Sequence, residues 1–243
     1  GIRVSYRTFS RLISYKFLIF ILCFATNAVF SEELVISKYK YDLYKGNIYF
    51  GVSEQKLIKN GSTYRFDIKS NSAGIFRLKK DDRLETSIFS RNNNMIIPVS
   101  YKFKKEKRTS LKLIETVFNP ENNYAYTIED EKKQEHIDIP YSLDRLSVQM
   151  DFQEKMKAGV FEYDYNIIDK GRLRKYSFRI HSDDVIDTLF GETNTIVIRK
   201  SIENNKRSTL TWYAIDYDFI PVKIEQYRKK SLKFSVILNK VYK

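Results

Sequence analysis

A metal site or histidine-based active site in this chain could draw on only two histidines, His136 and His181. His181 begins the run His-Ser-Asp-Asp at residues 181–184, where an imidazole and two carboxylates could hold a metal ion weakly. Metal sites and active sites need further groups that converge from elsewhere in the fold. We interpret the run as an exposed strand end and His136 as a solvated loop residue. We predict neither a metal site nor a cofactor.

A serine nucleophile is the second possibility, since Asp144 precedes Ser147 by three residues. Both residue types are also preferred where a helix begins, because their side chains accept hydrogen bonds from the first backbone N–H groups. We interpret the pair as a helix start. The sequence has no nucleophile elbow, zinc-protease helix, phosphate-cradling glycine loop or dinucleotide fingerprint. We predict that the protein is not an enzyme; the alternative, a cell-wall or glycan-acting enzyme, would use Asp144, His181 and Asp183.

The segment WYAIDYDFIPVKIEQY at residues 212–227 gathers the only tryptophan, Trp212, with Tyr213, Tyr217 and Phe219. Aspartates in its middle predict a turn, and Pro221 suits the start of a strand, where a missing N–H is tolerated. The four aromatic side chains could form one cluster that braces the hairpin. They could instead line a ligand cavity, because Trp and Tyr combine large apolar bodies with a polar group.

The elements that must position these residues are short strands, since apolar and polar residues alternate along much of the chain. Turn signals separate the alternating runs at residues 59–62, 169–171 and 204–206. Neighbouring runs of this kind pair as an antiparallel meander. Residues 141–159 lack proline, start near Ser142 and end at Gly159. We predict one main helix there, although Leu146, Val148, Met150 and Phe152 also alternate as in a strand.

The first 31 residues differ from the rest: four basic residues precede a short apolar run and a small-residue exit. This order is typical of a secretory signal peptide, so we expect a periplasmic protein, with an uncleaved, membrane-tethered form as the alternative. We expect no transmembrane span after cleavage. Residues 32–243 then form a single β domain without cysteine, because Cys23 lies in the apolar run.

The chain is basic, with 43 Lys and Arg against 30 Asp and Glu. Basic proteins attract nucleic acid or anionic membranes. The basic residues are spread along the sequence, however, and the densest clusters, at residues 102–108 and 226–230, stand between predicted strands. We interpret them as solvated hairpin ends and expect no nucleic-acid partner.

Several motifs together resemble the exported bacterial family catalogued as domain of unknown function 3108. The resemblance begins with YDLYKGNIYFG at residues 41–51 and continues with the Asp-x-x-Ser helix start and the hairpin DKGRLRKYSFRI at residues 169–180. It is strongest from residue 191 onward. The matching structural positions are Gly46, Gly51, Asp144, Ser147, Gly191, Trp212 and Pro221. Ile215, where proline is common, and Phe219, at a usually polar or aromatic turn position, depart from the pattern, so the turn geometry is less defined.

This resemblance implies export and an all-β fold but no activity. We expect a mainly antiparallel, strongly curved sheet or open barrel-like meander with one main helix, distantly similar to lipoprotein-carrier proteins. A long sheet curls rather than leaving wide exposed edges. We therefore predict a non-enzymatic binder of an apolar or amphipathic envelope molecule, such as a lipid or lipidated partner. The alternative is an envelope assembly factor that binds another protein through a sheet edge.

Overall fold

The computed structural model of the protein describes residues 33–78 and 80–242. The chain divides into two units, Gly1–Phe30 and Ser31–Lys243, and the description below concerns the second. The predicted signal peptide and Cys23 lie outside the described residues. Within the described part of the chain, no helix has the length and apolar character needed to cross a membrane.

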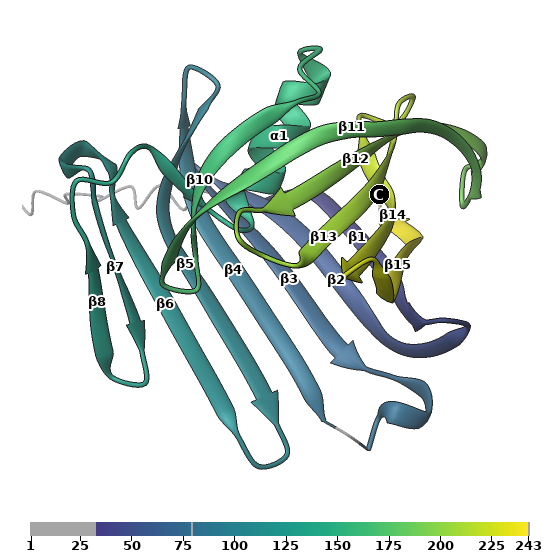
Figure 1. Ribbon diagram of the computed structural model, residues 1–243, viewed down its shortest axis with the longest axis horizontal. Coiled ribbons are helices and arrows are strands. Elements are labelled where there is room, and N and C mark those ends of the chain that lie inside the picture. The colour runs from purple at the N-terminus through teal and green to yellow at the C-terminus, as the bar shows by residue number, and fades with distance from the viewer. Residues whose placement is uncertain (1–32, 79, 243) are drawn as a thin grey trace, which may run out of the picture. The chain divides into compact units, whose positions relative to one another are not determined.

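Fifteen strands build one sheet in this unit (Figure 1). The first eight are β1 (Leu34–Lys45), β2 (Ile48–Asn60), β3 (Thr63–Ser72), β4 (Asp81–Asn92), β5 (Met95–Lys107), β6 (Leu111–Asn119), β7 (Tyr124–Glu129) and β8 (Lys132–His136). The others are β9 (Ser142–Asp144), β10 (Tyr163–Asp169), β11 (Arg172–Thr188), β12 (Gly191–Ile202), β13 (Arg207–Ala214), β14 (Ile220–Arg228) and β15 (Ser231–Tyr242). Two short 3-10 helices, η1 (Gly74–Phe76) and η2 (Pro120–Asn122), and one α-helix, α1 (Ser147–Lys157), complete the elements.

The sheet is a meander that runs in both directions from the pair formed by β1 and β15. Its order is β8-β7-β6-β5-β4-β3-β2-β1-β15-β14-β13-β12-β11-β10-β9. Every pairing is antiparallel except that of β9 with β10. The edges β8 and β9 are separate ends of this order, so the sheet is not closed. The predicted fold, a large and mainly antiparallel meander with one main helix, is confirmed.

The predicted turns connect these strands. Gly61 (φ +60°) lies between β2 and β3, and Lys170 and Gly171 (φ +49° and +76°) join β10 to β11. Positive φ angles of this kind give hairpin turns whose twist matches that of the strands. Residues 102–108 were expected at a hairpin end, but the structure places most of them within β5. That prediction was wrong because Phe103 is buried while Lys102 and Lys104 face solvent, which is ordinary strand alternation.

The α-helix is shorter than predicted. Its first turn is held by Asp144, whose Oδ1 accepts hydrogen bonds from the backbone N–H groups of Leu146 (2.8 Å) and Ser147 (2.9 Å). The sequence predicts that the helix starts near Ser142, but Ser142 belongs to β9 and donates its hydroxyl to the carbonyl of Pro140. At the other end Gly159 (φ +83°) ends the helix, since glycine adopts the left-handed conformation without strain.

The larger of two apolar cores lies between the two halves of the sheet. It is lined by one face of β2–β7, by the facing side of β9–β13, and by α1, which inserts Val148, Phe152 and Met156. We call this lining the inner face. Figure 1 shows β10–β13 crossing in front of β2–β6. The smaller core packs Tyr41 of β1 against apolar residues of β12–β15. The interior of the curved sheet is therefore filled largely by its own side chains.

Gly51 provides a direct test of the packing between β2 and β3. A Cβ atom at this position would lie 2.8 Å from the backbone oxygen of Asn71, closer than packed atoms approach. Because the obstacle is backbone, it cannot rotate away. We expect Gly51→Ala to lower the free energy of unfolding by about 1–3 kcal/mol. Chemical denaturation measures the effect, and Gly159→Ala, which meets no atom within 4 Å but carries φ +83°, separates the clash from backbone strain. Equal stability of wild type and Gly51→Ala would contradict the packing described.

Candidate functional site

A group of cationic side chains borders the larger core, and β12 contributes Lys200 to it. Ile196, Ile198, Lys200 and Ile202 occupy alternate positions of this strand. Alternate residues face the same side of a sheet, and Ile196 and Ile198 belong to the larger core. Lys200 therefore points to the inner face, at a position where the pattern calls for an apolar residue.

Polar residues on the neighbouring strands lie beside Lys200 on the same face of the sheet. Lys200 pairs with Thr209 of β13, and Thr209 pairs with Gln226 of β14. Directly paired residues lie on the same face, so the three side chains form one row. Arg207 and Arg228, which pair with each other, form the next row toward the turns.

Arg145 approaches from the opposite side, between β9 and α1. Its Nε lies 3.3 Å from Glu85 Oε2, and its guanidinium also lies 3.7 Å from Asp169 Oδ1. Tyr101 donates its hydroxyl to Glu85 at 2.7 Å. Glu85 and Asp169 are only 14% and 17% exposed, so Arg145 neutralises two largely buried carboxylates. A guanidinium with its planar set of donors suits such a role.

Tyr176 completes the wall by donating its hydroxyl to Asp169 Oδ2 at 2.8 Å. Asp169 Oδ1, although buried, accepts no hydrogen bond from any described residue. A buried acceptor without a partner is uncommon in folded proteins. This oxygen can therefore accept a hydrogen bond from water or from a ligand hydroxyl.

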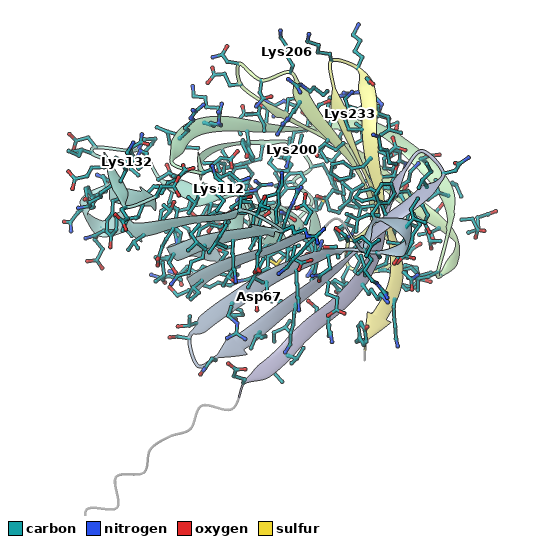
Figure 2. The ribbon with its side chains drawn as sticks, turned by 90° about the horizontal axis from the view of Figure 1, so that it is seen from below. Asp67, Lys112, Lys132, Lys200, Lys206 and Lys233 are labelled. Atoms are coloured by element: carbon teal, nitrogen blue, oxygen red, sulfur yellow. The ribbon has the colours of Figure 1, made fainter. Side chains whose placement is uncertain are left out.

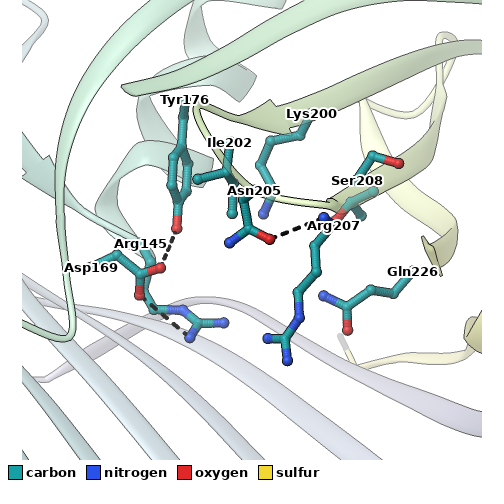
Figure 3. Close-up of a pocket in the computed structure, with 10 residues that line it drawn as sticks. Arg145, Asp169, Tyr176, Lys200, Ile202, Asn205, Arg207, Ser208 and Gln226 are labelled. Atoms are coloured by element: carbon teal, nitrogen blue, oxygen red, sulfur yellow. Dashed lines mark hydrogen bonds and ion pairs between the residues drawn. The ribbon is translucent and has the colours of Figure 1, made fainter. Parts of the chain in front are cut away.

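These groups surround a pocket of about 70 Å³, which we call the inner pocket (Figure 3). Arg145, Asp169, Tyr176, Lys200, Arg207 and Gln226 are among its lining residues. In Figure 3, Lys200, Arg207 and Gln226 point from the upper strands toward Arg145. Three cations and one carboxylate line a space that would hold a small anionic group such as a phosphate or carboxylate.

A second, wider hollow of about 450 Å³ adjoins the inner pocket and shares Asn205 and Arg207 with it. Its other lining residues are Arg172, Arg174, Asn204, Lys206 and Arg228. We call its five cations, Arg172, Arg174, Lys206, Arg207 and Arg228, the basic rim. No acidic residue lines it, and no described carboxylate forms an ion pair with any of the five.

The topology explains why the rim forms. In a meander every second turn lies at the same end of the sheet, so the turns after β10, β12 and β14 come together. Backbone hydrogen bonds hold them near their neighbours: the Lys229 N–H donates to the Lys206 carbonyl at 2.9 Å and joins two of the turns, and the Glu203 N–H donates to the carbonyl of Lys175 in β11 at 3.0 Å. Figure 2 shows Lys206 and Lys233 on the same side of the unit, and Lys132 away from both.

Burial changes the protonation of the two lysines near Arg145. Burial and the neighbouring guanidinium of Arg145 lower the pKa of Lys200 to about 8, and the same causes lower the pKa of Lys170 to about 8. Burial also opposes the charge of Arg145, but the carboxylates of Glu85 and Asp169 outweigh it, and the Arg145 pKa is raised. The surroundings of Lys200 therefore disfavour its charged form, and residues with such perturbed pKa values are frequent in functional sites.

The aromatic residues of the segment at residues 212–227 do not converge. Trp212 lies in the smaller core and donates its indole N–H to Asp184 Oδ2 at 3.0 Å, whereas Tyr213 lies in the larger core near Phe152. Successive strand residues face opposite sides, so the predicted single cluster was wrong. The two turn residues also have separate partners, as Tyr217 stacks on Phe190 at 4.0 Å and Phe219 meets Phe161 at 5.8 Å. Their proposed role in ligand binding remains a prediction.

Asp144 and Ser147 have the structural surroundings expected of a helix start. Asp144 is fully buried and its Oδ2 accepts the hydroxyls of Ser87 (2.7 Å) and Ser147 (2.8 Å). Burial raises the pKa of the Asp144 carboxyl. With both carboxylate oxygens already bonded within the fold, the pair is enclosed in the core.

The histidines lie apart. His181 is exposed, with its Nδ1 3.3 Å from the Arg199 guanidinium, but residues 181–184 lie within β11 and not at the strand end that the sequence predicts. His136 was expected in a solvated loop, but it belongs to β8, is 8% exposed, and faces Thr127. That expectation was wrong because strand alternation turns His136 inward from a charged segment, where burial lowers its pKa. Within the described residues, no three His, Cys, Asp or Glu side chains could hold a metal ion together.

The remaining motif positions support turns and strand starts. Gly46 (φ +58°) and Gly191 (φ +85°) take conformations that favour glycine. Pro221 is the second residue of β14, opposite a register shift in β13, and its carbonyl accepts the Tyr41 hydroxyl at 3.0 Å. These positions shape the fold and lie outside the inner pocket.

One comparison with a solved structure agrees with this architecture, and a family model matches most of the chain. The family model described as protein of unknown function (DUF3108) matches residues 39–235. Among curated proteins, no match was found. A crystal structure of a beta-barrel-like protein of domain of unknown function DUF1849 from Brucella abortus is similar, with a TM-score of 0.54 and 10% identity over 86% of this chain and 97% of that chain. A protein with a YmcC-like fold from Bacteroides fragilis has a TM-score of 0.35 and 11% identity over 85% of this chain and 95% of that chain.

Proposed function

Because the chain belongs to this family of proteins of unknown function, its role must be argued from its own site, and we propose that it binds an amphipathic envelope molecule through an anionic head group. The inner pocket receives the anionic group, with Lys200, Arg145 and Arg207 as its cations. The proposal includes the periplasmic location expected from residues 1–31. Binding, rather than catalysis, is the proposed activity.

The observation that carries the proposal is the uncompensated charge of the inner pocket. Several lysines elsewhere on the sheet have carboxylate partners, such as Lys102 with Glu115 at 3.0 Å. Lys200 has no carboxylate within ion-pair distance among the described residues, although its charge is partly removed from water and its pKa is lowered. Charges away from water are normally paired. An anionic ligand would supply the missing partner.

The apolar part of the ligand finds less room inside the protein. Side chains of α1 and both sheet halves fill the larger core, so a deep acyl cavity does not support the proposal. Leu173 on β11 and Leu232 on β15, 45% and 42% exposed, lie beside the basic turns but face the other side of the sheet, because successive strand residues alternate. We therefore propose that the head group enters the pocket while the apolar chain remains outside the filled interior of the protein.

The sheet edge is a less favoured binding surface. Edge strand β8 carries Lys132, Lys133 and Glu135, and charged residues on an edge discourage pairing with another strand. The other edge strand, β9, has three residues, all buried. An assembly role through β-strand pairing thus has weaker support than binding at the inner pocket.

Titration with a single-chain phospholipid tests the proposal. Lysophosphatidylglycerol, whose phosphodiester keeps one negative charge, should bind the protein below its micelle concentration, and lysophosphatidylcholine, whose head is neutral overall, should bind at least tenfold more weakly. Lys200→Met should reduce the affinity for lysophosphatidylglycerol by about tenfold, since one close charge contact is worth about 1–2 kcal/mol. Isothermal titration calorimetry measures both comparisons.

Lys132→Met is the matched control, because Lys132 is an exposed lysine of β8 remote from the pocket in Figure 2. It should bind lysophosphatidylglycerol as the wild type does. Equal binding of the two lipids, or equal losses in Lys200→Met and Lys132→Met, would show that the inner pocket does not select an anionic head group.

A further inference from the structure

The basic rim adds a second site beside the inner pocket, and the two share Arg207 and Asn205. We infer that the natural ligand carries two phosphate-like anionic groups, one held in the inner pocket and the other on the basic rim. This inference rests on the proposed function and specifies its ligand class.

Strand geometry places the rim on the same face as the pocket. Arg172, Arg174 and Tyr176 alternate on β11, so the two arginines share the face of Tyr176, which lines the inner pocket. Arg228 reaches the same face from β14 through its pairing with Arg207. The cations thus extend from the pocket toward the turns as a continuous surface.

The arrangement of charge separates the two sites chemically. In the inner pocket, Asp169 and the nearby Glu85 offset part of the positive charge through their contacts with Arg145. On the basic rim, five cations surround a space of about 450 Å³ with no carboxylate in its lining. Like charges gathered without partners repel one another, and a second anionic group would relieve that repulsion.

Arg207 connects the two sites. It begins β13, its backbone N–H donates to Asn205 Oδ1 at 3.0 Å, and its side chain lines both spaces. A guanidinium can bind two oxygens at once, so Arg207 can contact both anionic groups of one ligand. Two separate monoanionic ligands would instead crowd their charges around a single arginine.

Paired probes with one and two phosphates test the inference. Lysophosphatidylglycerol has one phosphate; dilysocardiolipin has two, joined by glycerol. Glycerol 3-phosphate and glycerol 1,3-bisphosphate repeat the comparison without acyl chains. We expect dilysocardiolipin to bind at least tenfold more tightly than lysophosphatidylglycerol. If the protein recognises the phosphates alone, glycerol 1,3-bisphosphate should likewise bind more tightly than glycerol 3-phosphate. Tight binding restricted to the lipid pair would identify a lipid head group as the source.

The double variant Arg174→Gln/Arg228→Gln isolates the rim. It should remove the advantage of dilysocardiolipin while leaving lysophosphatidylglycerol binding within about twofold of wild type. Lys45→Gln/Lys132→Gln removes two exposed charges elsewhere and serves as the control, and circular dichroism verifies folding. If lysophosphatidylglycerol binds at Lys200 but the second phosphate adds nothing, or the rim variant weakens both lipids equally, this inference is overturned and the proposed function stands. If lysophosphatidylglycerol does not bind at all, the proposed function fails first.

Discussion

Asp144→Ala is expected to lower the free energy of unfolding by about 3–5 kcal/mol, the scale found when one partner of a buried charged network is removed. Its two oxygens accept four hydrogen bonds, from the backbone N–H groups of Leu146 and Ser147 and from the hydroxyls of Ser87 and Ser147. The substitution leaves these donors unpaired inside the core. It also disconnects α1 from β4, which Ser87 joins to the helix start. Urea denaturation followed by circular dichroism measures the loss.

Asp144→Asn is the informative control. An amide retains one oxygen for the two backbone donors, and the serine hydroxyls can rotate to accept from its NH₂ group. We expect a loss of about 1–2 kcal/mol, clearly smaller than that of Asp144→Ala. If Asp144→Ala were as stable as the wild type, the hydrogen-bond network at the helix start would not hold the fold as described.

The affinity for lysophosphatidylglycerol should fall about tenfold between pH 7 and pH 9.5, because the cation that binds it is lost over this range. The pKa of Lys200 is lowered to about 8 by burial and by Arg145, with Asp169 and Glu85 acting in the opposite direction. The lipid phosphodiester does not titrate in this window, so the change reports the protein. Calorimetric titration across the pH range measures it.

Lys200→Met should remove most of this pH dependence, and Lys170, whose pKa is also lowered to about 8, accounts for the remainder. The same variant should be more stable. The folded protein resists protonation of Lys200 between pH 8 and its ordinary pKa of 10.5, so the charged lysine destabilises the fold fully below pH 8, and this cost disappears as pH rises toward 10.5. At pH 7 we expect Lys200→Met to raise the free energy of unfolding by about 1–3 kcal/mol. An unchanged pH profile in this variant, or a loss of stability, would contradict the role of Lys200.

Much of the fold follows from local patterns. Alternation in segments such as Tyr39, Tyr41 and Leu43 predicts strands, and the glycine turns predict which strands pair. The sequential order of the sheet then needs no further information. The pairing of β1 with β15 and the short parallel strand β9 depend on contacts between distant parts of the chain. Local propensity contains no signal for them.

The candidate site was harder to predict, although two signals were present. Lys200 interrupts the apolar stripe of Ile196, Ile198 and Ile202, and basic residues recur in every second turn after residue 169. The second signal acquires meaning only when the meander brings those turns to one end. The aromatic residues around Trp212 do not mark this site, because Trp212 and Tyr213 belong to separate cores.

Nuclear magnetic resonance titration of the Lys200 side chain tests the central claim most directly. Lysine labelled with carbon-13 at the ε position reports each ammonium group, and the signal missing from Lys200→Met identifies Lys200. We expect a pKa near 8 in the free protein and a rise of one unit or more when lysophosphatidylglycerol saturates the inner pocket, since a bound anion stabilises the charged form. An ordinary pKa near 10.5 in the free protein, or a pKa that lipid leaves unchanged, would contradict it.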